Sequence, residues 1–188
     1  MVKSPLQNSL YYAKVLLFGE YGIMEDAMGL SIPFEHFQGR FKAGPAQSDA
    51  EKASNNSLKA FADYLGGLSP AVPGLDLNRL NRDLEAGLHF ESNIPQGFGV
   101  GSSGALVAAV YEQYGPANLD LNSALQDPDA IQDIKARLGR MESFFHGRSS
   151  GMDPLICYLK IPMLMDRDRR LGQVTLPREA PNGQGAIF

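Results

Sequence analysis

Residues 95–105 carry the densest set of groups that could bind a ligand. The segment reads PQGFGVGSSGA, so glycine occupies positions 97, 99 and 101 and two serines follow. Glycines leave backbone N–H groups open to a close ligand, and a helix that begins at the serines adds free N–H donors and partial positive charge. Such an assembly is expected to bind phosphate, and a first-turn serine hydroxyl could reach a Mg²⁺ ion that the phosphate carries.

The same segment allows two other interpretations. Gly99, Gly101 and Gly104 match the G-x-G-x-x-G dinucleotide fingerprint, but that fingerprint opens directly off a strand, and the strand expected here ends near Ser92. The segment could also be a purely structural glycine-rich turn with a serine cap. The nucleotide loop G-x-x-x-x-G-K-[ST] is absent, because no lysine follows these glycines.

A second candidate site lies in residues 142–154, ESFFHGRSSGMDP. Glu142 falls at the flank of an apolar helical stripe, where a carboxylate would be partly buried and would need a donor or a cation, for which a metal is suitable. The alternative is a solvated glutamate at a helix end. His146 is assigned to packing or capping, and no second His or Cys stands at zinc-ligand spacing.

Asp153 stands in the turn-rich end of the same segment. Pro154 favours an extended backbone at the residue before it, so Asp153 could point into a cleft as a general base or as an anchor for a substrate hydroxyl. The alternative role is to hold a turn.

The third candidate is Lys14, within the apolar run 11–18. A lysine in such a strand either points outward or serves a buried partner, and for an isolated strand the outward orientation is favoured. Glu20, at the transition from this strand to a loop, is equally ambiguous on its own.

The elements expected to position these residues are a mixture of helices and strands. Strands are predicted at residues 11–18, 36–42, 87–92 and 171–176, and residues 69–82 are expected to form a loop or an irregular helix. Ser48 and Glu51 have capping-box spacing before a helix that Gly66 and Gly67 stop. Further helices are predicted at residues 102–114 and 127–145.

Composition excludes several classes of protein. The 188 residues are 44% hydrophobic and 20% charged, which indicates a globular chain with a sizeable core. A net charge of −4 argues against a broad nucleic-acid surface, and no apolar run reaches membrane-spanning length. The single cysteine, together with an N-terminus that shows no signal peptide, predicts a cytoplasmic location.

Taken in order, the three segments resemble the GHMP kinases, and most closely mevalonate kinase. The first motif is carried by residues 13–20, AKVLLFGE, and the ATP loop by residues 95–105 with its GSS core. The third, which points to the mevalonate kinase branch, is Glu142-x-x-x-His146-Gly147-x-x-Ser150-Gly151-x-Asp153.

The resemblance implies roles residue by residue. Asp153 would take up or orient the proton of the substrate hydroxyl, and Lys14 beside it would stabilise charge on the transferred phosphoryl group. Ser103 and Glu142 would hold Mg²⁺. The ATP phosphates would be bound by Pro95, Gly97, Gly99, Gly101, Ser102 and Ser103.

The sequence also departs from the family pattern. Glu20 and Tyr21 match a stretch next to the substrate pocket, but mevalonate kinases usually have His at position 21, and a Glu-Tyr pair also resembles phosphomevalonate kinases. Arg148 and Ser149 replace the usual Asn-Pro, and Gly104 stands where the family prefers Ala. These departures affect the expected substrate more than the expected reaction.

The fold implied by the resemblance is α+β, the GHMP-kinase N-terminal domain (ribosomal protein S5 domain 2-like), with a mixed sheet and helices packed on it. Residues 1–188 would form this domain. Since residues 186–188 look like the opening of a strand and the family's C-terminal glycine loop is missing, we expect a chain truncated before or at the start of the C-terminal domain.

The implied function is ATP- and Mg²⁺-dependent phosphoryl transfer to the hydroxyl of a small metabolite, with mevalonate, an isoprenoid precursor, as the leading acceptor. Phosphomevalonate, another GHMP-kinase substrate or a non-catalytic nucleotide sensor are the alternatives. The expected partners are ATP and a small alcohol, without nucleic acid or membrane, and a homodimer is left open.

Overall fold

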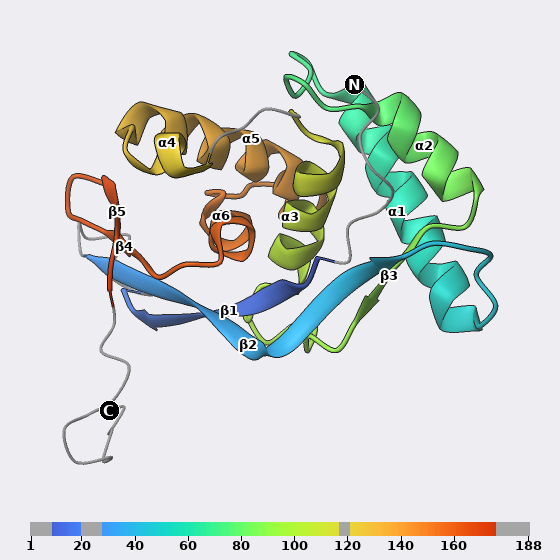
Figure 1. Cartoon of the computed structure of the whole chain (residues 1–188), viewed down its shortest axis with the longest axis horizontal. Helices are drawn as coiled ribbons and strands as arrows, with labels where there is room; N and C mark the ends of the chain where they lie inside the picture. Colours follow the sequence, from blue (N-terminus) through green and yellow to red (C-terminus); the bar gives the residue numbers. More distant parts are fainter. Residues whose placement is uncertain (1–8, 20–27, 117–120, 176–188) are drawn as a thin grey trace.

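The computed structural model describes residues 9–19, 28–116 and 121–175. In this part of the chain, helices cover one face of a five-stranded sheet (Figure 1). In chain order the elements are β1 (Tyr11–Phe18), β2 (Gly29–Lys42), α1 (Asp49–Gly67), α2 (Leu77–Glu85), β3 (His89–Ser92), α3 (Ser102–Tyr114), α4 (Leu121–Leu125), α5 (Pro128–His146), α6 (Met152–Leu159), β4 (Met163–Met165) and β5 (Leu171–Gln173).

The long strand β2 organises the sheet. β1 pairs with β2 along one side, whereas β3 and β4 pair with its two ends on the other side, at residues 39–42 and 29–31, and β5 pairs with β4. Every pairing is antiparallel in the described residues. The α+β fold is therefore confirmed, but the expected mixed sheet is an antiparallel one, because the connections between strands return the chain in the opposite direction.

The helices α3 and α6 lie next to each other on the sheet and form the centre of the core (Figure 1). Almost the whole surface of α3 is buried, including its alanines and valines from Ala105 to Val110. Small side chains let α3 approach both β1 and α6 closely. The helix that follows the candidate ATP loop is thereby fixed in place.

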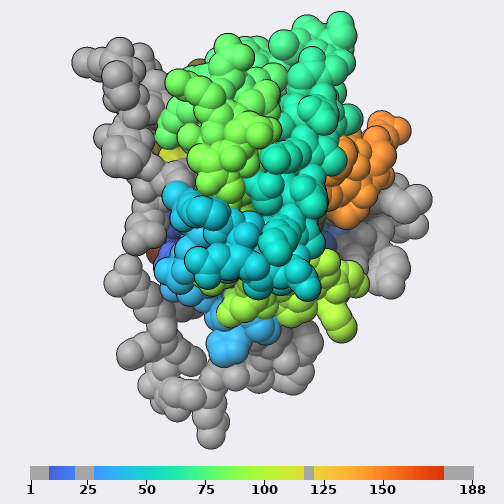
Figure 2. All heavy atoms as spheres, turned by 90° about the vertical axis from the view of Figure 1, so that its right-hand side faces the viewer, coloured from blue at the N-terminus to red at the C-terminus, as the bar shows by residue number. Residues whose placement is uncertain are grey.

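The helices α1 and α2 lie side by side over the end of the molecule that contains β3 (Figure 2). The predicted capping box is present at the start of α1, because Ser48 and Glu51 accept each other's backbone N–H groups. The buried Asn55 donates from Nδ2 to the carbonyl oxygens of Leu84 and Leu88, at 3.0 and 2.7 Å. This amide connects α1 to the segment that leads into β3.

Other sequence predictions are confirmed or corrected. The bounds of β1 and α3 agree with the prediction, and α5 differs by one residue at each end. β2 begins at Gly29 rather than at residue 36, and the expected loop or irregular helix at residues 69–82 contains the start of the regular helix α2. β5 ends at Gln173, short of the predicted end at residue 176, which lies outside the described residues. No helix in residues 9–19, 28–116 and 121–175 is long and apolar enough to cross a membrane.

Candidate active site

The loop between β3 and α3 exposes its backbone at two glycines. Gly97 and Gly99 have φ angles of +81° and +68°, which favour glycine, and a Cβ placed on either would meet nothing within 4 Å. The buried Ile94 anchors the start of the loop, whereas Phe98 is 78% exposed. Backbone N–H groups around these glycines are therefore accessible to a ligand.

The N-terminus of α3 follows the loop directly. Gly101, with φ +82°, caps the helix without any side-chain hydrogen bond. The first N–H groups of a helix have no partner inside it, so those near Ser102 and Ser103 are available to an anion. Pro95, Ser102 and Ser103 are partly exposed along this stretch.

Lys14 is buried and serves a partner, contrary to the outward orientation favoured for an isolated strand. Its side chain is 8% exposed, and its Nζ lies 2.9 Å from Oδ1 of Asp153, which is 37% exposed. The backbone N–H of Lys14 donates to the carbonyl of Val100 at 2.9 Å. β1 is therefore joined directly to the glycine loop, and the proximity of Lys14 to Asp153 expected from the resemblance is confirmed.

Asp153 is in a helix, and the extended backbone predicted for it is wrong. It is the second residue of α6, whose cap is Gly151 with φ +77°. Proline is tolerated in the first turn of a helix because its missing N–H has no partner to lose there, so Pro154 does not prevent α6 from including Asp153. α6 approaches α3 so closely that a Cβ on Gly104 would lie 2.9 Å from the backbone of Asp153 and Pro154.

Glu142, on α5, is a buried carboxylate with hydroxyl partners. It is 3% exposed; Ser103 Oγ donates to its Oε1 at 3.1 Å, and Ser149 Oγ donates to its Oε2. Burial raises the pKa of Glu142 above its ordinary value, the hydrogen bond from Ser149 opposes the rise, and the negative charge of Asp153 adds to it. The prediction that Glu142 is buried and partnered is confirmed.

His146 contacts the same hydroxyl from the other side. Its Nε2 lies 2.9 Å from Ser103 Oγ, and the residue is exposed at the end of α5. His146 therefore contacts a side chain of the candidate site, whereas the sequence assigned it to packing or capping. Sequence reasoning gave neither His146 nor Ser149 a role in the site. The four-residue spacing from Glu142 to His146 puts both on one helix face, and that was the available signal. No spacing pattern points to Ser149.

A hard cation fits the oxygen atoms at this place. Ser103 and Glu142 supply a hydroxyl and a carboxylate at the N-terminus of α3. Asp153, whose ion-pair partner is Lys14, adds a second carboxylate close enough for its charge to act on Glu142. No group of three His, Cys, Asp or Glu side chains in the described part of the chain could hold a metal alone. Mg²⁺ is typically held by one or two protein groups plus phosphate and water, so the donor set is sufficient for it.

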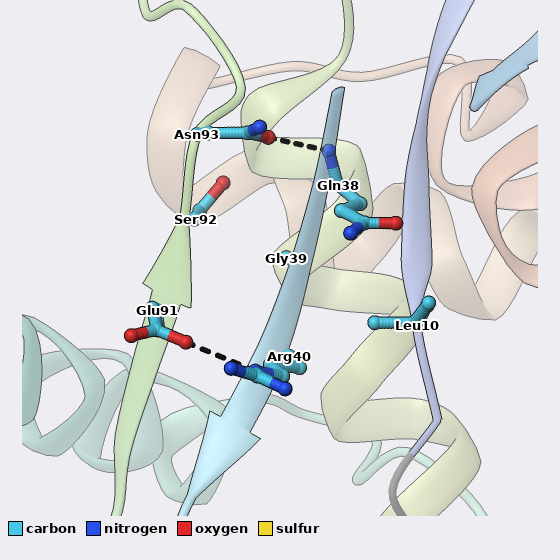
Figure 3. Close-up of a pocket in the computed structure, with 7 residues that line it drawn as sticks. All are labelled: Leu10, Gln38, Gly39, Arg40, Glu91, Ser92 and Asn93. Carbon is cyan, nitrogen blue, oxygen red and sulfur yellow. Dashed lines mark hydrogen bonds and ion pairs between the residues drawn. The ribbon is translucent and has the colours of Figure 1, made fainter. Parts of the chain in front are cut away.

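A cavity of about 280 Å³ lies apart from these residues, where the start of β1 faces β2 and β3 (Figure 3). Its charged side chains neutralise each other, since Arg40 Nε lies 2.9 Å from Glu91 Oε2. Asn93 accepts a hydrogen bond from the backbone N–H of Gln38 at 2.7 Å. None of the candidate catalytic residues lines this cavity, so it is not the centre of the chemistry. The predicted substrate residues Glu20 and Tyr21 lie outside the described residues.

The comparisons with known proteins identify the family. The family model of the GHMP kinases N terminal domain matches residues 56–160, more than half of the chain, so the chain belongs to the GHMP kinase family. A search of the curated proteins found no match.

Solved mevalonate kinases share the fold. The L. major mevalonate kinase in complex with R-mevalonate matches with a TM-score of 0.55 at 17% identity, over 97% of this chain and 58% of that one. The Methanococcus jannaschii mevalonate kinase matches with a TM-score of 0.54 at 14% identity, over 92% and 57%. The chain therefore spans little more than half the length of these enzymes.

Proposed function

We propose that this chain carries the ATP-binding and catalytic residues of an ATP- and Mg²⁺-dependent kinase that phosphorylates the hydroxyl group of a small molecule, with mevalonate as the leading acceptor. The observation that best supports this proposal is the ion pair between Lys14 and Asp153, 2.9 Å long. It lies beside Ser103 and Glu142 at the N-terminus of α3. The L. major structure contains R-mevalonate, which supports this choice of acceptor. Residues 1–188 would act as the N-terminal domain of such a kinase.

The glycine loop would bind the phosphates of ATP. N–H donors are offered by the open backbone at Gly97 and Gly99 and by the first turn of α3, which has no side-chain cap. Partial positive charge at a helix N-terminus adds to their attraction for an anion. Gly101 would contribute by holding the αL conformation that turns the loop into the helix, and Pro95 by fixing its entry.

Ser103 and Glu142 would hold Mg²⁺. When bound with ATP, the ion would offset negative charge on the phosphate oxygens during transfer. The chain's own contribution is to keep the buried Glu142 carboxylate and the Ser103 hydroxyl next to each other, 3.1 Å apart. A protein oxygen pair fixed before binding loses less freedom when the ion arrives.

Asp153 and Lys14 would act on the acceptor. Asp153 is partly exposed at the start of α6, so its carboxylate can accept the proton of an incoming hydroxyl. The ammonium of Lys14, held within 2.9 Å of that carboxylate, would stabilise charge on the phosphoryl group as it moves. Positioning and electrostatic stabilisation are the main contributions to catalysis of this reaction class.

The test is ADP release by the full-length protein with Mg-ATP and mevalonate, phosphomevalonate, galactose or homoserine. Replacing Asp153 by Asn removes the base and keeps the shape, so we expect turnover to fall by about 10²–10⁴-fold while ATP binding is retained. Near-normal turnover of D153N would show that Asp153 is not the base. ATP binding without turnover of any acceptor would favour a nucleotide sensor, and turnover of phosphomevalonate alone would move the acceptor to that compound.

A further inference from the structure

Ser149 makes two hydrogen bonds that join the candidate metal site to the candidate base. Its hydroxyl donates to Oε2 of Glu142 and accepts the backbone N–H of Gly151 at 3.0 Å. Gly151 is the cap of α6, two residues before Asp153. One side chain therefore touches both the carboxylate on α5 and the start of the helix that carries Asp153.

The Glu142 carboxylate depends on this contact for its orientation. Ser103 holds Oε1, and the Ser149 hydroxyl is the hydrogen-bond donor described for Oε2. With both oxygens engaged, rotation about the last side-chain bond is restricted. Because Glu142 is almost fully buried, losing one donor leaves a polar oxygen without compensation, and the carboxylate would turn to recover a partner.

The neighbouring backbone makes the arrangement rigid. Gly139 of α5 packs on Gly151, where a Cβ on Gly139 would lie 3.0 Å from the Gly151 nitrogen and 3.1 Å from the Ser149 carbonyl oxygen. Ser149 therefore cannot move far from α5. Its hydroxyl is held over Glu142 by backbone packing as well as by its own bonds.

We propose that Ser149 is a positioning residue for the metal site: it fixes the Glu142 carboxylate for a divalent cation and couples that carboxylate to the α6 N-terminus. This inference rests on the proposed function. The family pattern described above has proline at this position. Proline has no hydroxyl and can make neither of the two hydrogen bonds of Ser149, so this link between Glu142 and α6 is a feature of this chain. It assigns a use to a residue that otherwise counts only as a departure from the pattern.

The experiment measures cation binding without turnover. Free Mn²⁺, used as the probe in place of Mg²⁺, is titrated by electron paramagnetic resonance into the chain with β,γ-imido-ATP present. Ser149→Ala removes both hydrogen bonds, and we expect Mn²⁺ affinity to fall by about tenfold or more, as for other groups that orient metal ligands. Ser149→Thr keeps a hydroxyl and should bind close to the wild-type level.

Ser143→Ala is the matched control. Ser143 follows Glu142 on α5, and its hydroxyl donates to the carbonyl of Gly139 at 2.8 Å, away from the carboxylate. S143A should therefore bind Mn²⁺ like the wild type. Hydrogen exchange supplies a second readout: the Gly151 amide should exchange faster in S149A than in S143A.

Wild-type affinity in S149A, or an equal loss in S149A and S143A, would overturn the role of Ser149. Absence of Mn²⁺ and nucleotide binding in the wild type would instead contradict the proposed function, and the inference with it. The two failures are thus distinguished by the wild-type titration.

Discussion

Replacing Gly104 by Ala tests the contact that places Asp153. A Cβ at this position would lie 2.9 Å from the Asp153 carbonyl carbon and the Pro154 nitrogen, and 3.2 Å from the Asp153 Cβ. Carbon atoms pack at roughly 3.5–4.0 Å, so the start of α6 would have to move by roughly 0.6–1 Å. The atoms that the new Cβ would meet at 2.9 Å belong to the backbone, so they cannot rotate away as a side chain could. Since the family prefers alanine here, the resemblance alone would predict a harmless change.

The expected energy has two opposing parts. Alanine favours a helix over glycine by about 1 kcal/mol, whereas overpacking a core costs about 1–3 kcal/mol. Gly66→Ala is the matched control, because the new Cβ would meet only Leu77 Cδ1, at an ordinary 3.9 Å. G66A should gain up to about 1 kcal/mol of stability, and the free energy of unfolding of G104A should lie about 1–3 kcal/mol below that of G66A.

Urea denaturation of both variants and the wild type, followed by circular dichroism, measures this difference. Hydrogen exchange in residues 151–155 should increase in G104A and stay unchanged in G66A, because only the former pushes on α6. Equal stabilisation by the two substitutions would refute the reasoning, since it would mean that α3 and α6 can separate at no cost.

Two further predictions concern the loop and the sheet. Gly101→Ala should destabilise the chain more than Gly97→Ala, measured by urea denaturation: both residues have φ above +80°, which costs another residue about 1–2 kcal/mol, but only at Gly101 would the Cβ meet Lys14 Cγ, at 2.9 Å. Glu91→Gln should lower Tm at pH 7 and have less effect at pH 3, because the hydrogen bond from Arg40 lowers the pKa of Glu91. That stabilisation is complete above the unfolded pKa of about 4.3 and is lost as pH falls through the lowered folded value; an effect of equal size at both pH values would contradict it.

The sequence predicted those elements whose signals are local. The apolar, aromatic-rich run of β1 ends at Gly19, and the serines that follow the glycine loop mark the start of α3, so both elements were bounded correctly. α6 was missed because its last six residues, 154–159, are all buried, which removes the polar and apolar alternation that marks a surface helix. In addition, Pro154 favours an extended backbone at the residue before it, which argued against a helix at Asp153.

Four residues of the candidate site could be predicted from the sequence, whereas the contacts that His146 and Ser149 make there could not. Lys14, Ser103, Glu142 and Asp153 came from motifs, and the structure brings them together. The contacts of Ser149 depend on how the loop after α5 folds back on it, and no spacing in the sequence records that. Periodicity within a helix can predict a shared face, but a hydrogen bond across a loop depends on tertiary packing.

The glycines of the loop and its helix divide into two groups that look alike in the sequence. Gly97 and Gly99 face open space, so their missing side chains leave room for a ligand. Gly101 and Gly104 face Lys14 and Asp153, so their missing side chains leave room for the two residues that form the ion pair. A substitution in the first group should weaken phosphate binding with the ion pair intact, whereas one in the second should shift the ion pair itself. Under the proposed function, the first pair of glycines would serve phosphate binding, whereas the second pair keeps space for Lys14 and Asp153.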